Sequence, residues 1–251
     1  MSVHDTARRG FASAADVYEE SRPTYPTEAI SWLSDRLELG PGRTVLDLAA
    51  GTGKLSRLLT PTGATVIAIE PVDEMRQTLA RTTPAADVRP GTAERTGLPD
   101  GSTHAVTVAQ AFHWFDGPAA LAEIHRVLRP GGRLALVWNV RDLNDPVQHD
   151  VEQLFAPYRG DTPSHRSGAW RIALDETDLF SPGAGREFSN IQTMDADTLV
   201  RRVASTSFIA DLPAPEREKV LDRARDIAAK QPARFPFPYT TQIDVYERLT
   251  P

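Results

Sequence analysis

The sequence predicts an α/β fold built on a doubly wound, Rossmann-like sheet. Between residues 43 and 140, short apolar strands alternate with helical segments, as in a parallel sheet covered by helices on both faces. The first strand, 43–48, leads directly into a glycine turn that opens a helix, as in nucleotide-binding βα units. At 251 residues the chain can bury one large core, so we expect a single domain over residues 1–251.

The first half of the chain divides into elements by its apolar periodicity and its turn residues. Two helices, 11–22 and 27–39, are predicted before the sheet, with a proline-rich turn between them. The predicted strands that follow are 43–48, 64–69, 86–89, 104–109 and 133–138. The helices expected between them are 53–60, 72–81 and 117–129.

The second half has a different pattern. Residues 159–184 are rich in Gly, Pro, Ser and charge, and we expect them to form an irregular excursion near the active site. Residues 235–249 alternate apolar and polar side chains, which predicts a long strand close to the sheet edge. The other expected elements are helices at 145–158, 196–206 and 214–230 and a strand at 186–193. We therefore divide the domain into a helical lid, a cofactor-binding core, and a cap with the remaining sheet: 1–40, 41–140 and 141–251.

Composition excludes several classes of function. The net charge of −6 and the pI near 5.5 make nucleic acid an unlikely main partner, because phosphate binding requires a basic face. The chain has no cysteine, which excludes disulfides, cysteine metal sites and thiol nucleophiles. No stretch approaches the roughly 20 apolar residues of a membrane span, and the N-terminus does not resemble a secretory signal. We expect a cytoplasmic monomer or homodimer without a membrane partner.

The turn after the first strand predicts a nucleoside-bearing cofactor. Gly51 and Gly53 allow the backbone to approach a ligand where a Cβ would collide. Glu70 ends the next strand, about 20 residues beyond the turn, where a carboxylate accepts hydrogen bonds from the hydroxyls of a ribose. We expect these residues to bind the nucleoside end of the cofactor.

Two neighbouring residues decide which cofactor. The dinucleotide fingerprint places a third glycine where this chain has Ser56. The carboxylate of Asp47, just before the turn, is an awkward neighbour for a diphosphate but suits a cofactor with an ammonium group and a cationic sulfur. A P-loop is excluded because no G-K-[ST] follows at the required spacing. The cofactor that fits is S-adenosylmethionine.

Five short motifs, in this order along the chain, carry a resemblance to a known family. They are Asp47-x-x-x-Gly51-x-Gly53, Glu70-Pro71, Gly91-Thr92-Ala93-Glu94, Gln110-Ala111-Phe112-His113-Trp114-Phe115 and Leu128-Arg129-Pro130-Gly131-Gly132. The chain resembles the class I S-adenosylmethionine-dependent methyltransferases, and more narrowly the small-molecule branch that includes trans-aconitate-methyltransferase-like proteins. The resemblance implies a seven-stranded sheet with its last strand antiparallel, an N-terminal helical lid and a small cap insertion.

The motifs also indicate which residues would bind the cofactor. The resemblance places Ala93 and Glu94 beside the adenine, although Glu94 also fits an exposed loop acid. Pro71 fixes the turn into the next helix, from which Met75 could pack on the adenine. The cofactor-binding residues that we predict are Asp47, Ala49, Gly51, Thr52, Gly53, Glu70, Pro71, Met75, Ala93, Glu94, Gln110 and Ala111.

The substrate side is predicted from the aromatic run after the fourth strand. His113 is the only histidine that we expect near the chemistry, either as a general base or as an orienting residue. Arg22 and Arg141 are candidate anchors for an anion. The remaining candidates for the substrate wall and the lid are Tyr18, Tyr25, Trp114 and Trp138. We predict no metal site, because no histidines or carboxylates have ligand spacing.

The expected reaction is transfer of a methyl group from S-adenosylmethionine to a small molecule, leaving S-adenosylhomocysteine. We expect an oxygen acceptor, with a carboxylate among the candidates, attacking in line by SN2 while the protein supplies geometry and excludes water. A nicotinamide-dependent oxidoreductase is the first alternative, disfavoured by Ser56 and Asp47. The second is a protein of the same fold that binds S-adenosylmethionine without methylating, and the sequence leaves it open.

Overall fold

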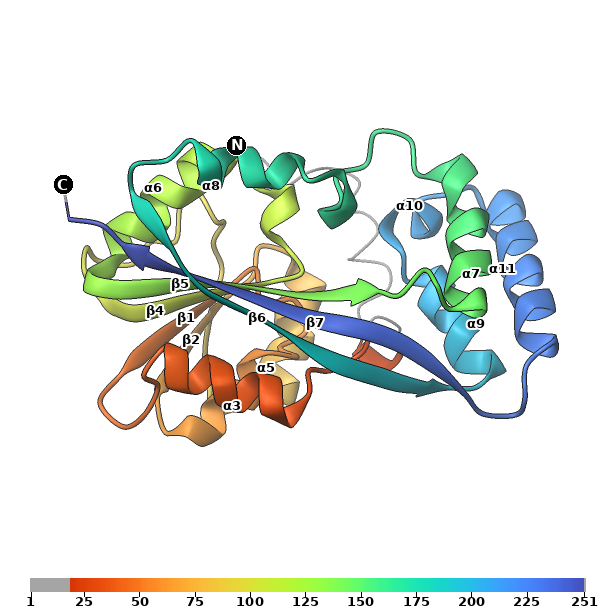
Figure 1. Cartoon of the computed structure of the whole chain (residues 1–251), viewed down its shortest axis with the longest axis horizontal. Helices are drawn as coiled ribbons and strands as arrows, with labels where there is room; N and C mark the ends of the chain where they lie inside the picture. The colour runs from red at the N-terminus through yellow and green to blue at the C-terminus, as the bar shows by residue number, and fades with distance from the viewer. Residues whose placement is uncertain (1–18, 251) are drawn as a thin grey trace.

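The computed structural model describes residues 19–250, and a seven-stranded sheet forms its centre (Figure 1). The strands are β1 (Thr44–Leu48), β2 (Thr65–Ile69), β3 (Asp87–Arg89), β4 (Thr103–Ala109), β5 (Leu128–Arg141), β6 (Phe180–Met194) and β7 (Phe235–Arg248). Their order is β3-β2-β1-β4-β5-β7-β6. The first five strands run parallel, and β7 runs antiparallel to β5 and β6. The doubly wound sheet and the antiparallel last strand are confirmed.

The strand order places a topological switch point between β1 and β4. From β1 the chain moves outward to β2 and β3, and it then returns to β4 on the other side of β1. Crossover connections leave in opposite directions from this point, so a crevice opens beyond the carboxyl ends of the two strands. The glycine turn begins at the end of β1, directly at this crevice.

Helices cover both faces of the sheet. On one face, α3 (Thr27–Arg36) and α4 (Ser56–Leu59) pack apolar side chains, including Leu33 and Leu59, against β1, β4, β5 and β7. On the other face lie α6 (Gly117–Val127) and α8 (Ile172–Asp175) with Trp170. The helix α5 (Asp73–Thr82) contacts β3 at the far edge.

A cap of helices lies beyond the sheet. The long strands β5, β6 and β7 extend past the shorter ones, and α7, α9, α10 and α11 gather at that end (Figure 1). The bounds of these helices are Pro146–Phe155, Ala196–Ala204, Ser207–Ala210 and Ala214–Ala229. Their buried side chains form a separate apolar core with Phe235, Phe237 and Tyr239 of β7. The predicted cap is therefore present, built on the protruding ends of β6 and β7.

The predicted irregular excursion at 159–184 is wrong in part. It contains the short helical turns His165–Ser167 and Ala169–Arg171, then α8, and its last residues belong to β6. The sequence Pro182-Gly-Ala-Gly185 is typical of a loop, but β6 is an edge strand, where a missing N–H is tolerated. The pairing with β7 shifts register between Pro182 and Gly185, which absorbs the irregularity.

Two helix predictions need smaller corrections. The predicted helix 53–60 is reduced to α4 and a 3₁₀ turn over Thr60–Thr62, because Gly53 still belongs to the left-handed turn at φ +86°. The helix predicted to end at residue 129 ends at Val127, and β5 begins at Leu128. Most of the predicted helix 11–22 lies outside the described residues, as does Tyr18. Within residues 19–250, no helix is both long and apolar enough to cross a membrane.

Candidate functional site

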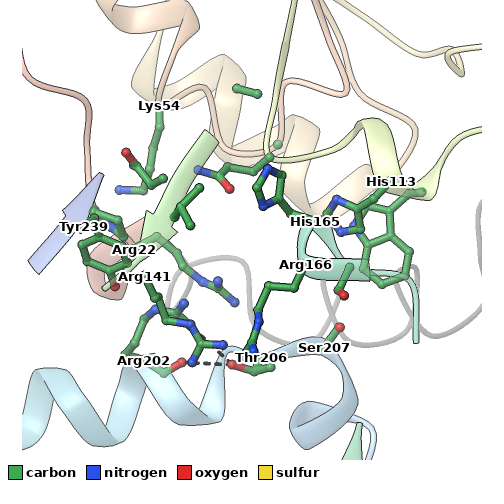
Figure 2. A pocket seen from close by; sticks show the side chains of 18 of the residues that line it. Arg22, Lys54, His113, Arg141, His165, Arg166, Arg202, Thr206, Ser207 and Tyr239 are labelled. Atoms are coloured by element: carbon green, nitrogen blue, oxygen red, sulfur yellow. Dashed lines mark hydrogen bonds between the residues drawn. The ribbon is translucent and has the colours of Figure 1, made fainter. Parts of the chain in front are cut away.

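A cavity of about 570 Å³ lies between the switch point and the cap. It is bordered by the glycine turn, the end of β4, the end of β5, and side chains of the cap (Figure 2). The predicted site residues that line it are Arg22, Tyr25, Ala49, Gly51, Thr52, Gln110, His113, Trp114 and Arg141. The predicted residues that do not line it are Asp47, Gly53, Glu70, Pro71, Met75, Ala93, Glu94, Ala111 and Trp138.

The strands on either side of the switch point end in strained backbone. Ala49 follows β1 with φ 55° and Gln110 follows β4 with φ 58°, both in the left-handed region. That conformation costs about 1–2 kcal/mol for a residue with a Cβ. Both residues line the cavity. Strain of this kind is typical of functional sites, where the surrounding structure holds it in place.

The two glycines of the turn are required for different reasons. Gly51 has φ +59°, and a Cβ built on it meets nothing within 4 Å, because it faces the open cavity. Gly53 has φ +86°, and a Cβ there would collide with Leu79 Cδ1 and lie 2.8 Å from Thr83 Oγ1. Gly51 therefore keeps the backbone accessible to a ligand, and Gly53 lets the turn pack against α5.

Glu70 lies beneath the glycine turn. Its carboxylate accepts hydrogen bonds from the backbone N–H of Gly51 and of Val72, each at 2.8 Å. The side chain is 5% exposed, and this burial raises the pKa of Glu70 to about 7. A carboxylate offers about four lone-pair sites, so the two amide bonds leave acceptor capacity for a ligand.

Asp47 has a supporting position. It is fully buried and accepts hydrogen bonds from Ser56 Oγ at 2.5 Å and Thr107 Oγ1 at 3.0 Å. Burial raises the pKa of Asp47 to about 6. Ser56, which replaces the third glycine of the dinucleotide fingerprint, thus connects the start of α4 to β1. An interaction of Asp47 with the cofactor ammonium stays a prediction.

The residues predicted near the adenine are Met75, Ala93 and Glu94. Met75 on α5 is 2% exposed, and Ala93 is buried in the core on one face of the sheet. Glu94 accepts a hydrogen bond from the backbone N–H of Asp116 at 3.1 Å, which connects this loop to the start of α6. None of these three residues lines the cavity, and their position beside an adenine stays a prediction.

An aromatic wall contains two histidines instead of one. The His113 ring lies 4.9 Å from Trp114 and 5.6 Å from Trp138, between centroids. His165, on the cap side, lies 4.6 Å from Trp138 and also lines the cavity, so the expectation that His113 alone is near the site is wrong. Burial lowers the pKa of His113 to about 3 and that of His165 to about 4. Both imidazoles are therefore neutral and only weakly basic.

Residues 19–25 form a strap along the cavity. At one end Glu19 accepts hydrogen bonds from Thr52 Oγ1 at 2.5 Å and from Arg57 at 2.6 Å, and its carbonyl accepts one from Lys54. At the other end Arg22 Nη2 donates to the carbonyl of Ser205, at 3.0 Å. The strap therefore joins the glycine turn to the cap, while α3 packs on the sheet.

Replacing Glu19 by glutamine should loosen the strap. The variant loses ionic hydrogen bonds that contribute about 1.5–3 kcal/mol. We expect backbone amides of residues 19–25 to exchange hydrogen about tenfold faster or more, with β1 and β4 unchanged, as measured by hydrogen exchange with mass spectrometry. Glu20→Gln is the matched control, because Glu20 is exposed and its ion pair with Arg201 is long, at 3.9 Å. Equal exchange in the two variants would contradict this role of Glu19.

Several residues of the cavity escape sequence analysis. Lys54 belongs to no recognised motif, and the others come from the cap and from the segment before β6: Arg159, His165, Arg166, Arg202 and Tyr239. These cap residues reach the cavity through the long-range pairing of β5, β6 and β7. The only local signal is the alternation of β7, which makes Tyr239 a buried position. Among the described residues, no group of three or more His, Asp or Glu could hold a metal.

The fold and the site define a class I S-adenosylmethionine-dependent methyltransferase. A family model described as a methyltransferase domain matches residues 46–136. The uncharacterized methyltransferase Rv3342 of Mycobacterium tuberculosis is 41% identical over 223 residues, which span 89% of this chain and 87% of the relative. The methyltransferase-like protein C25B8.10 of Schizosaccharomyces pombe, also uncharacterized, is 36% identical, over 86% of this chain and 84% of its own. The chain belongs to this methyltransferase family.

Solved structures show the same fold. A candidate type II methyltransferase from Anaeromyxobacter dehalogenans superposes with a TM-score of 0.65 at 25% identity, over 92% of this chain and 99% of that one. Geranyl diphosphate C-methyltransferase from Streptomyces coelicolor, solved with S-adenosyl-L-homocysteine, has a TM-score of 0.53 at 15% identity, over 89% and 77%. At that identity the second likeness concerns the fold alone. The narrower trans-aconitate-like branch stays a prediction.

Proposed function

We propose that this protein binds S-adenosylmethionine at the switch point and methylates an oxygen atom of a small molecule in the cavity. The observation that carries the proposal is the position of the cavity, which opens on Gly51 between the ends of β1 and β4. Its volume of about 570 Å³ suits a small-molecule site, since such sites usually measure roughly 300–1,000 Å³.

The residues present suit the cofactor. Gly51 leaves its backbone open to the cavity, and Glu70 keeps acceptor sites for ribose hydroxyls next to that turn. Met75, Ala93 and Glu94 would surround the adenine. When bound, the cofactor supplies an electrophilic methyl group on a cationic sulfur. The complex of the Streptomyces neighbour with S-adenosyl-L-homocysteine supports this assignment.

The protein's own contribution is positioning and exclusion of water. The wall of His113 and Trp114 presents aromatic surface to the cavity, which suits both a cation and an apolar substrate. The strap connects the glycine turn to the cap and borders the same space. A carboxylate acceptor needs no proton removed, so in that case the site functions without a general base.

The low pKa of His113 gives a pH prediction. An imidazole with a pKa of about 3 is neutral at neutral pH and accepts a proton weakly, so we infer that His113 orients the substrate. His113→Asn should raise the Michaelis constant about tenfold, because it removes a wall residue, and should leave the shape of the pH–rate profile unchanged between about pH 6 and pH 8. A turnover that falls while its pH dependence disappears would identify a base instead.

Transfer of label tests the proposed function. The protein is incubated with methyl-labelled S-adenosylmethionine and a metabolite extract, and labelled products are separated by size and analysed by mass spectrometry. We expect label in a molecule small enough for the cavity, together with S-adenosylhomocysteine. Binding without transfer would favour the non-methylating alternative, and binding of NADH but not the sulfonium would favour an oxidoreductase. Either result contradicts the proposal.

A further inference from the structure

Arginine side chains gather at the cap end of the cavity. Figure 2 shows Arg22, Arg141, Arg166 and Arg202 around one space, below the two histidines. They come from the strap, the end of β5, the helical turn His165–Ser167 and α9. Arg159 also lines the cavity, and Asp142 is the only acidic residue among the described residues that do so. This concentration of positive charge occurs in a chain whose net charge is −6.

Carboxylates among residues 19–250 neutralise this charge only in part. Glu152 on α7 binds three of the guanidinium groups, those of Arg141 at 2.5 Å, Arg159 at 2.6 Å and Arg166. One carboxylate therefore faces three cations. Burial, together with the nearby charge of Arg202, lowers the pKa of Arg141 to about 10. Within the described part of the chain, the cavity therefore holds more positive charge than carboxylates neutralise.

Buried donors at this end have no acceptor within the described part of the chain. They are Arg141 Nη1, Arg202 Nε and Tyr239 Oη. Arg202 is 7% exposed and Tyr239 is 3% exposed, and both line the cavity. Arg202 is held by a hydrogen bond from Nη1 to Thr206 Oγ1 at 3.3 Å, and Arg141 lies over the ring of Phe155 at 5.3 Å. Leaving such donors unsatisfied is costly, and an oxyanion would satisfy several at once.

This group of donors lies away from the glycine turn. The backbone N–H of Gln110 donates to the carbonyl of Val137, so these two residues are level across the β4–β5 pair. Arg141 lies four residues further along β5, which is about 13 Å at the usual rise of a strand. A ligand that reaches both regions needs two separate functional groups.

We propose that Arg141, Arg202 and Tyr239 form a subsite for an oxyanion of the substrate, a carboxylate or a phosphate, remote from the atom that is methylated. This inference rests on the proposed function, because it takes the ligand of the subsite to be the molecule that the protein methylates. The subsite itself is a property of the cap. It makes the substrate a bifunctional anion, with the acceptor near the aromatic wall and the charged group beneath α9.

The competing explanation is structural: the arginines would only attach the cap to the core. The explanations differ in what they predict for Arg202, which forms no hydrogen bond to a carboxylate among those found in residues 19–250. A structural arginine changes the melting temperature and binds no anion. A subsite arginine changes the affinity for an anion.

Calorimetric titration of the full chain with citrate and with inorganic pyrophosphate tests the subsite and separates the two sources of oxyanion. The titrations are carried out at constant ionic strength, and we expect either citrate or pyrophosphate to bind with one site per chain. Arg202→Gln should weaken that binding by about tenfold or more, and Tyr239→Phe by about threefold. Arg225→Gln is the control, since Arg225 is an exposed arginine of α11 that pairs with Glu218 and Asp222.

The outcomes are distinct. Absence of binding for both probes, or equal weakening by Arg225→Gln, would overturn the subsite. Should Arg202→Gln fail to fold, Tyr239→Phe decides in its place, because it removes one hydroxyl and leaves the ring packed. Binding of S-adenosylhomocysteine is measured in parallel and should not change in Arg202→Gln. If the wild-type chain bound the anion but did not bind S-adenosylhomocysteine, the proposed function would be overturned and the subsite would remain supported.

Discussion

Replacing Glu70 by glutamine should weaken the binding of S-adenosylhomocysteine by about 1–3 kcal/mol, or roughly five- to 150-fold. Glutamine has one acceptor oxygen where the carboxylate has two, and the wild-type oxygens already accept from the backbone N–H of Gly51 and Val72. The amide therefore cannot serve both the turn and a ribose. Isothermal titration calorimetry well below the melting temperature measures the change.

The pH dependence of the same binding gives an independent check. Burial raises the pKa of Glu70 from 4.5 to about 7, so below that pH the free protein carries a proton on this carboxyl. The ionised carboxylate is the better acceptor for hydroxyls. Affinity should therefore rise from about pH 6 to pH 8, with a proton released on binding below pH 7, and Glu70→Gln should abolish both effects.

The raised pKa also affects stability, with a definite sign. The folded chain retains a proton that the unfolded chain loses above pH 4.5. The stabilisation of the folded state by this proton is therefore present at low pH and is lost as the pH rises through about 7.

Glu74→Gln, at an exposed position on α5, is the control for the binding experiments on Glu70→Gln. If Glu74→Gln and Glu70→Gln had the same cofactor affinity and pH profile, Glu70 would not belong to the site.

Alanine at the two turn glycines should separate stability from binding. At Gly53 the new Cβ collides with Leu79 and the backbone has φ +86°, so Gly53→Ala should lower the free energy of unfolding by about 2–4 kcal/mol. That corresponds to a fall of about 4–16 °C in melting temperature for a domain of this size. Gly51→Ala meets no atom within 4 Å and should lower the free energy of unfolding by only about 1–2 kcal/mol.

The affinity for S-adenosylhomocysteine should show the reverse order. Gly51 faces the cavity, so its methyl group would occupy space that we assign to the cofactor, and Gly51→Ala should weaken binding about tenfold or more. Gly53→Ala should bind with nearly unchanged affinity at temperatures where it is folded. Thermal unfolding and calorimetry on the two variants measure both quantities. Equal losses of stability, or an unchanged affinity in Gly51→Ala, would contradict the different roles given to the glycines.

The switch-point end of the fold could be predicted from the sequence because its signals are local. The strand before Gly51, the turn itself and Glu70 lie within one βαβ unit. The left-handed turn requires glycine, and a carboxylate at the end of the second strand is typical of nucleoside-binding βαβ units. The doubly wound sheet follows from the alternation of strands and helices over residues 43–140. The long strand at 235–249 was predicted from its period of two, and β7 confirms it.

The cap end of the cavity could not be predicted in the same way. Arg202, His165 and Tyr239 are isolated in sequence, and they meet only because β5, β6 and β7 carry the cap back over the sheet. The irregular composition of residues 159–184 conceals three short helical turns and the start of an edge strand. The hydrogen bond of Asp47 with Thr107 was also beyond sequence patterns, because the two residues lie 60 positions apart on β1 and β4.

We infer that the glycine turn and Glu70 bind the adenosyl part of a sulfonium cofactor. Calorimetric titration of the wild-type chain with S-adenosylmethionine and S-adenosylhomocysteine tests it directly. We expect saturable heat with one site per chain for both compounds, and none for NADH. If neither compound produced heat up to about 1 mM, while the chain remained folded by circular dichroism, the turn and Glu70 would not form a site for this cofactor.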